Sequence, residues 1–276
     1  MVETRALVAQ MPLVRRARGF RLYDMSGRRI IDMYLSGGAA FLGHRGAGTL
    51  RESKEVLSRG LGTGMRSVHT ARLAKALARL LPSHPFARVF SCLHTALDAV
   101  AVFQGIRTDA AEIVDPAVGP CPAASLVSFW RPLLPPDAEP EAEVLLPILP
   151  SEGVCVACFR DDPGERVSGD LVSPHLAAAA ARGVADLLAG NASSERAQIS
   201  HEVACAIAGS PTWNLRGPYL SVRADAQTYA AVFSAFLGAG VLLSPFFPGP
   251  SILPAEASAG EMALLKRLLA ATPEKK

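Results

Sequence analysis

The feature that most constrains the fold is an alternation of short apolar runs with helix-patterned segments through the middle of the chain. Residues 144–148 and 154–159 are continuous apolar runs, which are typical of strands buried on both faces of a sheet. Before them, four leucines recur at helical spacing: Leu73, Leu77, Leu80 and Leu81. After them, Ser173 and Pro174 open an alanine-rich segment that predicts a long helix. This alternation predicts an α/β domain in which helices are layered on a sheet.

The segments between these landmarks fit the same pattern, with one irregular stretch. Residues 86–91 predict another buried strand, and residues 96–103 predict another helix. Residues 116–143 contain many prolines and an acidic run, so we expect irregular surface there.

The two ends of the chain carry a different pattern. Residues 19–35 alternate with period two on either side of a central glycine turn, which predicts a β-hairpin. Near the C-terminus, residues 218–223 predict a strand, and Asp225 is a typical N-cap for the helix that follows. Ser258 and Glu261 have the spacing of a capping box for the last helix. We expect these terminal segments to pack together in a small α+β lobe built from both termini.

Composition excludes several classes of protein. Half of the 276 residues are hydrophobic, which excludes a disordered chain. The chain has 28 basic and 25 acidic residues and few aromatic ones, so we expect no nucleic-acid partner. No apolar run reaches the roughly 18 residues of a membrane span, and residues 1–18 lack a secretory hydrophobic region, so we expect a cytoplasmic protein. Only 19% of residues are charged, which favours a covered partner surface, most simply in an oligomer.

Cysteine and histidine offer two weak candidates for chemistry. Cys155 and Cys158 form a C-x-x-C pair, but no second pair of ligands is evident, so we expect no metal site and interpret both as buried structural thiols. Cys92 and His94 suggest a thiol nucleophile and base for a hydrolase-like site. The alternative is a core cysteine beside a histidine at a helix N-terminus.

Lysine has an unusual distribution. The chain contains five lysines: Lys54, Lys75, Lys266, Lys275 and Lys276. No lysine occurs in the 190 positions from 76 to 265. Any chemistry that needs a lysine amine from the central part of this chain is therefore excluded.

Several stretches follow an order of residues specific to one family. Residues 19–28 read Gly-Phe-Arg-Leu-Tyr-Asp-Met-Ser-Gly-Arg, with Ile-Asp at 31–32 and Leu-Gly-His at 42–44. The C-terminal third agrees through residues 229–251 and the helix that begins near Glu261. The chain resembles class III aminotransferases, in particular the glutamate-1-semialdehyde aminomutase branch.

The resemblance implies a pyridoxal-phosphate (PLP)-dependent transferase fold of type I. It implies a large α/β domain, a small terminal lobe and a homodimer, here with a shortened central domain. We therefore expect residues 1–70 to form the N-terminal segment of the small lobe, residues 71–195 the central α/β domain, and residues 196–276 the C-terminal part of the lobe.

Departures from the family pattern fall on the cofactor pocket. The family's Schiff-base lysine has no counterpart in the lysine-free span. Leu93 stands where the phosphate-binding turn has glycine, and Thr95 where it has an acidic residue. Gly169 stands where the neighbouring subunit supplies a threonine to the phosphate. Residues 144–160 carry no carboxylate matching the one that holds the pyridine nitrogen.

The resemblance leaves three hypotheses for function. The first is a degenerate, non-catalytic relative that binds a ligand or protein partner, without catalytic residues or a covalent cofactor. Leu93, His94, Thr95 and Gly169 would line its ancestral cofactor pocket, and Ser36 would lie on the substrate side or in a plain turn. The second is an active PLP-dependent aminotransferase or aminomutase completed by a partner subunit. The third is the hydrolase-like site at Cys92. The expected partners are a second copy or a true aminotransferase.

Overall fold

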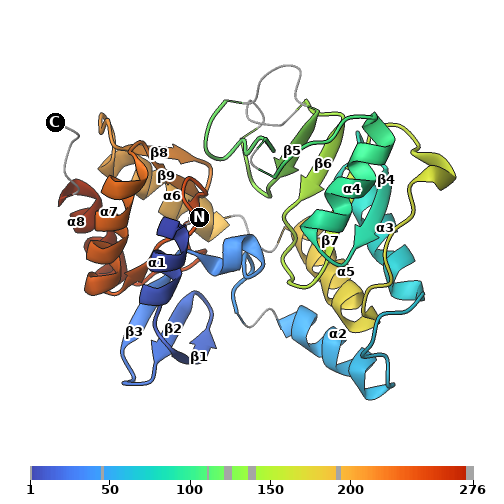
Figure 1. Cartoon of the computed structure of the whole chain (residues 1–276). Helices are drawn as coiled ribbons and strands as arrows, with labels where there is room; N and C mark the ends of the chain where they lie inside the picture. The colour runs from blue at the N-terminus through green and yellow to red at the C-terminus, as the bar shows by residue number, and fades with distance from the viewer. Residues whose placement is uncertain are drawn as a thin grey trace. The chain divides into compact units, whose positions relative to one another are not determined.

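The chain divides into two compact units (Figure 1). The computed structural model describes residues 2–44, 47–110, 112–120, 126–135, 141–190 and 194–271. Unit 1 comprises Met1–Arg45, Leu133–Pro135 and Ala192–Lys276, and unit 2 comprises Gly46–Pro132 and Pro136–Asn191. The sequence-based division placed residues 47–70 with the terminal lobe, whereas α2 (Ala47–Ser58) packs against α5 (Pro174–Leu188) in unit 2.

Unit 2 is built on a four-stranded sheet of order β4-β7-β6-β5. The strands are β4 (Phe86–Phe90), β5 (Val127–Trp130), β6 (Val144–Pro147) and β7 (Cys155–Phe159). β7 pairs antiparallel with β4 and β6, and β5 pairs parallel with β6. The three strands predicted from apolar runs are confirmed. The expectation of irregular structure throughout residues 116–143 was wrong, because β5 lies within it as a short strand paired along β6.

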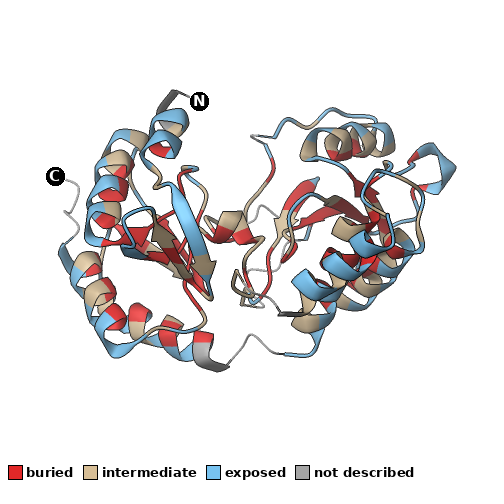
Figure 2. Cartoon of the chain, turned by 90° about the horizontal axis from the view of Figure 1, so that it is seen from below, coloured by how far each residue is buried: buried red, intermediate tan, exposed pale blue. Residues whose placement is uncertain are grey.

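Helices cover both faces of this sheet. The apolar stripe of α3 (Val68–Leu80) and the alanines of α5 pack on one face, in a cluster that includes Leu73, Leu77 and Ala177. α4 (Leu93–Gln104) packs on the other face through Ala96 and Val100. Figure 2 shows the buried residues gathered on the strands and the exposed residues on the outer helix surfaces. The helices predicted around residues 73–81, 96–103 and 174–190 are confirmed.

Unit 1 holds two small sheets. The first has the order β1-β2-β3-β10, formed by Val14–Arg18, Arg21–Asp24, Arg29–Asp32 and Val241–Leu242. The second has the order β11-β9-β8, formed by Ser251–Ile252, Tyr219–Val222 and Trp213–Arg216. The predicted hairpin is confirmed by the antiparallel pairing of β2 with β3. β10 then pairs parallel with β3, which joins the C-terminal part of the chain to the hairpin.

Four helices pack around these sheets: α1 (Val2–Gln10), α6 (Ser194–Ala206), α7 (Ala226–Ala239) and α8 (Ala259–Ala271). The Asp225 carboxylate accepts the Thr228 N–H at 2.8 Å, so the predicted N-cap is confirmed. Ser258 and Glu261 exchange the two bonds of the capping box, at 2.7 and 3.3 Å. One core cluster contains apolar residues from the hairpin and from the C-terminal helices: Leu22, Ile30, Ile31, Phe233, Phe236, Leu265 and Leu269.

Candidate functional site

The N-terminus of α4 is where the sequence places most candidate residues. β4 ends at Phe90, and the chain passes through Ser91 into Cys92, which has extended backbone angles and is the N-cap of α4. Because a helix leaves its first N–H groups unpaired, this end offers donors to an acceptor. Leu93, His94 and Thr95 form the first turn that follows.

Asp170 is an acceptor that lies beside this end of α4. Its Oδ2 accepts hydrogen bonds from the Ser91 N–H at 3.0 Å, the Ser91 hydroxyl at 2.7 Å and the Thr95 hydroxyl at 2.7 Å. Partial burial opposes ionisation, but these donors outweigh it and hold the pKa of Asp170 below its ordinary value. A carboxylate of the chain itself therefore lies beside the N-terminus of α4 and takes up donors of Ser91 and Thr95.

Gly169 is held tightly against β4. A Cβ added at this position would lie 2.4 Å from the Val89 carbonyl oxygen, so no side chain fits unless the strand moves. The next residue anchors the segment, because the Asp170 N–H donates to the same oxygen at 2.9 Å. Glycine is thus required here for close packing of two backbone segments.

Gly169 and Asp170 also line a cleft of about 600 Å³ within unit 2. Its other walls come from the loop before α3, the start of α3 and β4, and include Arg66, Ser67, Thr70 and Arg88. Arg88 is already engaged, because its Nε donates to the Val167 carbonyl at 3.0 Å. The cleft therefore combines hydroxyl and guanidinium groups and one carboxylate with apolar side chains such as Met65 and Leu171.

Leu93 and His94 face a different, smaller hollow of about 340 Å³. The His94 imidazole is 76% exposed, and its Nε2 lies 3.5 Å from an Asp98 carboxylate oxygen. The Cys92 thiol instead faces the Thr95 hydroxyl at 3.7 Å. The structure thus places the imidazole beside Asp98 and the thiol beside Thr95, an arrangement that does not support the hydrolase-like hypothesis.

Ser36 belongs to unit 1, whereas the other four candidates belong to unit 2. It lies in a turn over Leu35–Gly38 with a left-handed φ of 51°, next to Leu35 at 48°. Asp32 supports this strained turn, since its Oδ1 accepts the N–H groups of Tyr34 and Leu35 at 2.9 Å each. Its Oδ2 lies 2.7 Å from Nε2 of His44.

Cys155 and Cys158 are separated by the strand that carries them. Cys158 packs in the core cluster on the α3 and α5 side of the sheet, whereas Cys155 packs on the α4 side. Burial raises the pKa of Cys155 to about 11 and raises that of Cys158 further above its ordinary value. Over the residues that the structure describes, no group of three or more histidine, cysteine or acidic side chains is placed to hold a metal ion.

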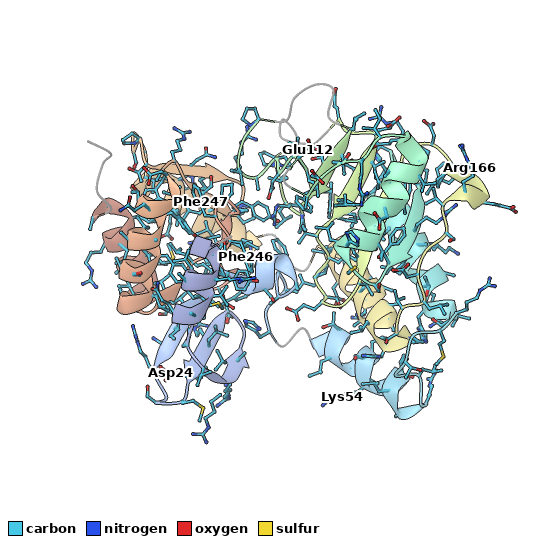
Figure 3. All side chains as sticks on the ribbon, viewed as in Figure 1. Asp24, Lys54, Glu112, Arg166, Phe246 and Phe247 are labelled. Carbon is cyan, nitrogen blue, oxygen red and sulfur yellow. The ribbon has the colours of Figure 1, made fainter. Side chains whose placement is uncertain are left out.

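The described lysines are all on helix surfaces. Lys54 on α2 (Figure 3) and Lys75 on α3 are exposed, and Lys266 on α8 is paired with Glu202 at 2.7 Å. None of these three lines the cleft that contains Asp170. Lys275 and Lys276 lie outside the described residues.

Sequence reasoning named Thr95 and Gly169 as candidates but did not name Asp170, which follows Gly169 and accepts the Thr95 hydroxyl. The signal available was weak: an acidic residue directly after the Gly169 position.

Across the described ranges, no helix is both long and apolar enough to traverse a membrane.

Solved structures with the same fold are aminotransferases and a related aminomutase. Glutamate-1-semialdehyde aminomutase from Pseudomonas aeruginosa PAO1 matches with a TM-score of 0.69 and 16% identity, over 94% of this chain and 86% of that chain. An omega-transaminase from Sphaerobacter thermophilus matches with a TM-score of 0.68 and 12% identity, over 95% and 90%. The chain therefore has the α/β fold of type I PLP-dependent aminotransferases, as its sequence predicts.

Sequence relatives fall into two groups. Glutamate-1-semialdehyde 2,1-aminomutase from Desulfosudis oleivorans is 35% identical over 101 residues, which are 36% of this chain and 24% of that protein. An uncharacterized protein of Treponema pallidum is 28% identical over 291 residues, which cover 90% of this chain and 91% of that protein. No protein-family profile matches the chain. The predicted resemblance to class III aminotransferases is confirmed by these structural and sequence matches. The sequence match to the Desulfosudis oleivorans aminomutase spans 24% of that protein.

Proposed function

We propose that the chain is a degenerate aminotransferase-like protein that acts by binding a ligand or protein partner, without PLP catalysis. The observation that carries the proposal is the absence of lysine from position 76 to position 265. PLP enzymes use a lysine amine to form the Schiff base, and arginine cannot replace it because its guanidinium stays protonated. The exposed positions of Lys54 and Lys75 on helix surfaces add to this argument.

The geometry at α4 is a second support. When bound, PLP supplies an electron sink, and its phosphate needs a cradle of free N–H donors. Here the Ser91 N–H and the Thr95 hydroxyl already bond to Asp170. A phosphate dianion brought to the same place would meet the Asp170 carboxylate, and Leu93 replaces the glycine that permits close approach. The residues present do not fit the cofactor.

The partner in this proposal is a second copy of the chain, or a true aminotransferase, in the cytoplasm. Apolar side chains are exposed beside the cleft: Val68 is 65% exposed and Leu171 is 63% exposed. The two segments that carry them are linked by the Met65 N–H, which donates to the Val172 carbonyl at 3.3 Å. Exposed apolar side chains that neighbour one another are a frequent feature of protein interfaces.

The test is an absorbance scan of the purified protein with added PLP, followed by borohydride reduction and peptide mass analysis. We expect no new visible band and no PLP mass fixed to the chain, with an active aminotransferase as positive control. Lys54→Ala and Lys75→Ala are matched control variants, since labelling at either of these two lysines should disappear with its substitution. A visible band that borohydride fixes to one lysine would contradict the proposal. PLP mass that borohydride fixes to this chain only after a partner aminotransferase is added would favour the completed-enzyme alternative.

A further inference from the structure

Two cysteines of unit 2 lie where β4 leads into α4 and where the neighbouring strand β7 begins. Cys155 is the first residue of β7 and pairs with Phe90, the last residue of β4. Cys92 lies two residues beyond Phe90, and its backbone is still extended, with φ −154° and ψ 169°. Paired residues share a face, so Phe90 and Cys155 both project toward α4. After a bend at Ser91, Cys92 is the N-cap of that same helix, so both cysteines lie at the N-terminal end of α4.

The two thiols have different environments. Cys92 is exposed, and its sulfur faces the N–H groups of Thr95 and His94 at the start of α4. These donors, Thr95 first, hold the pKa of Cys92 below its ordinary value. The charged groups around this end of α4 are Asp170, which is bonded to Thr95, and the His94–Asp98 pair. Cys155 is partly buried and its pKa is raised by that burial, with Cys92 adding to the effect.

We propose that Cys92 and Cys155 form a peroxide-sensitive thiol pair, in which Cys92 is oxidised first and Cys155 then closes a disulfide. In the first step the Cys92 thiolate attacks a peroxide oxygen, the O–O bond breaks and hydroxide leaves, which gives a sulfenic acid. In the second step the Cys155 sulfur attacks the Cys92 sulfur, the S–O bond breaks, and water leaves with the Cys155 thiol proton. Two thiols lose two electrons, and one hydrogen peroxide becomes two waters.

Closing the disulfide needs a small local movement. A disulfide needs the two Cα atoms about 4.4–6.8 Å apart. The segment Ser91-Cys92 follows the last paired residue of β4, so it can move toward Cys155 without breaking a strand pair. Oxidation would then withdraw the sulfur from the N-terminus of α4. This inference does not depend on the proposed function.

The experiment treats the reduced full-length protein with one equivalent of hydrogen peroxide and maps the products by mass spectrometry without reduction. Cleavage after Glu152 and Arg160 releases Cys155 and Cys158 together, apart from the peptide that contains Cys92. We expect a cross-linked pair of these two peptides. Cys158→Ala should leave the cross-link intact, because Cys158 lies on the opposite face of β7. Cys155→Ala should abolish it and let a Cys92 sulfenic acid accumulate, which dimedone traps.

Two further measurements separate this pair from general thiol oxidation. Cys92→Ser should slow the peroxide-dependent loss of the Cys155 thiol by about tenfold or more. Cys205 is the control for an exposed thiol away from a helix N-terminus, since it is exposed and lies near the C-terminal end of α6. The proposal would be overturned by a cross-link from Cys92 to Cys158 or Cys121 instead. It would equally be overturned if Cys205 were oxidised as fast as Cys92, or if Cys92 and Cys155 both stayed reduced.

Discussion

Replacing Arg196 with methionine is expected to stabilise unit 1. The Arg196 guanidinium is 1% exposed and lies over the Phe41 ring, 3.9 Å from its centroid. Its Nη2 donates to the Phe41 carbonyl at 2.6 Å, but within the described part of the chain its Nε and Nη1 have no hydrogen-bond partner. Buried charges are normally paired, so this side chain carries an unusual electrostatic cost.

The size of that cost follows from the environment. Burial lowers the pKa of Arg196 from 12.5 to about 10. At about 1.4 kcal/mol for each pH unit, this corresponds to about 3 kcal/mol against the charged form in the folded state. Stacking on the aromatic ring stabilises the charged form by about 1 kcal/mol, and the hydrogen bond to the Phe41 carbonyl stabilises it by about 1 kcal/mol more. Methionine fills similar volume without charge, so the expected gain is about 1 kcal/mol.

Urea unfolding at pH 7 measures this gain. The chain has two tryptophans, so Trp130→Phe leaves Trp213, which is buried in unit 1, as the fluorescent reporter. The Arg196→Met midpoint should rise by about 0.5 M urea, given a slope of about 2 kcal/mol per molar. Arg196→Ala is the matched control and should lose about 2–4 kcal/mol, because it leaves a cavity. If the methionine variant unfolds at lower urea than the parent, the unpaired nitrogens have partners and the reasoning is wrong.

Two further predictions concern the cores of the two units. Leu265 is 1% exposed in the cluster shared by the hairpin and the C-terminal helices. Leu265→Ala should therefore lower the free energy of unfolding in urea by about 2–5 kcal/mol. Leu13→Ala, at a position 80% exposed, is the control and should lower it by less than about 0.5 kcal/mol. In unit 2, His84 is buried, with Nε2 2.9 Å from the Ala142 carbonyl oxygen, and burial lowers its pKa below 6.5. The unfolded chain therefore binds the proton first, so the stability of the fold falls as pH drops below about 6.5. His84→Gln should reduce this loss of stability between pH 7 and pH 5, as followed by thermal unfolding. If stability depends on pH equally in the variant and the parent, His84 is not the cause.

The parts of the fold that the sequence predicts correctly are those with local signals. The hairpin at residues 19–35 has period-two alternation around a glycine turn, and its register in the structure follows from that pattern. The caps at Asp225 and Ser258 need only residues within one helical turn, and both form the expected bonds. Such features require no knowledge of distant contacts.

The parts that sequence reasoning missed depend on contacts between distant segments. α6 has no clear apolar stripe because Arg196 occupies a core position beside Ile199 and Val203. β5 is a four-residue strand among prolines, and its pairing along β6 is what defines it. Asp170 acts on Ser91, which is 79 positions away in sequence. Nothing in the neighbourhood of Asp170 marks it as a helix-capping group.

The lysine-free span and the Asp170 carboxylate beside α4 are independent observations, and each concerns a different part of the PLP molecule. The first follows from sequence alone and concerns the covalent bond to the aldehyde. The second follows from geometry and concerns the phosphate, because the Asp170 carboxylate lies beside the N-terminus of α4 and takes the Ser91 N–H and the Thr95 hydroxyl. A chain that had lost only its lysine would still hold the cofactor through its phosphate. With Asp170 in that place, the proposal extends to non-covalent PLP, and restoring a lysine would not by itself restore the pocket.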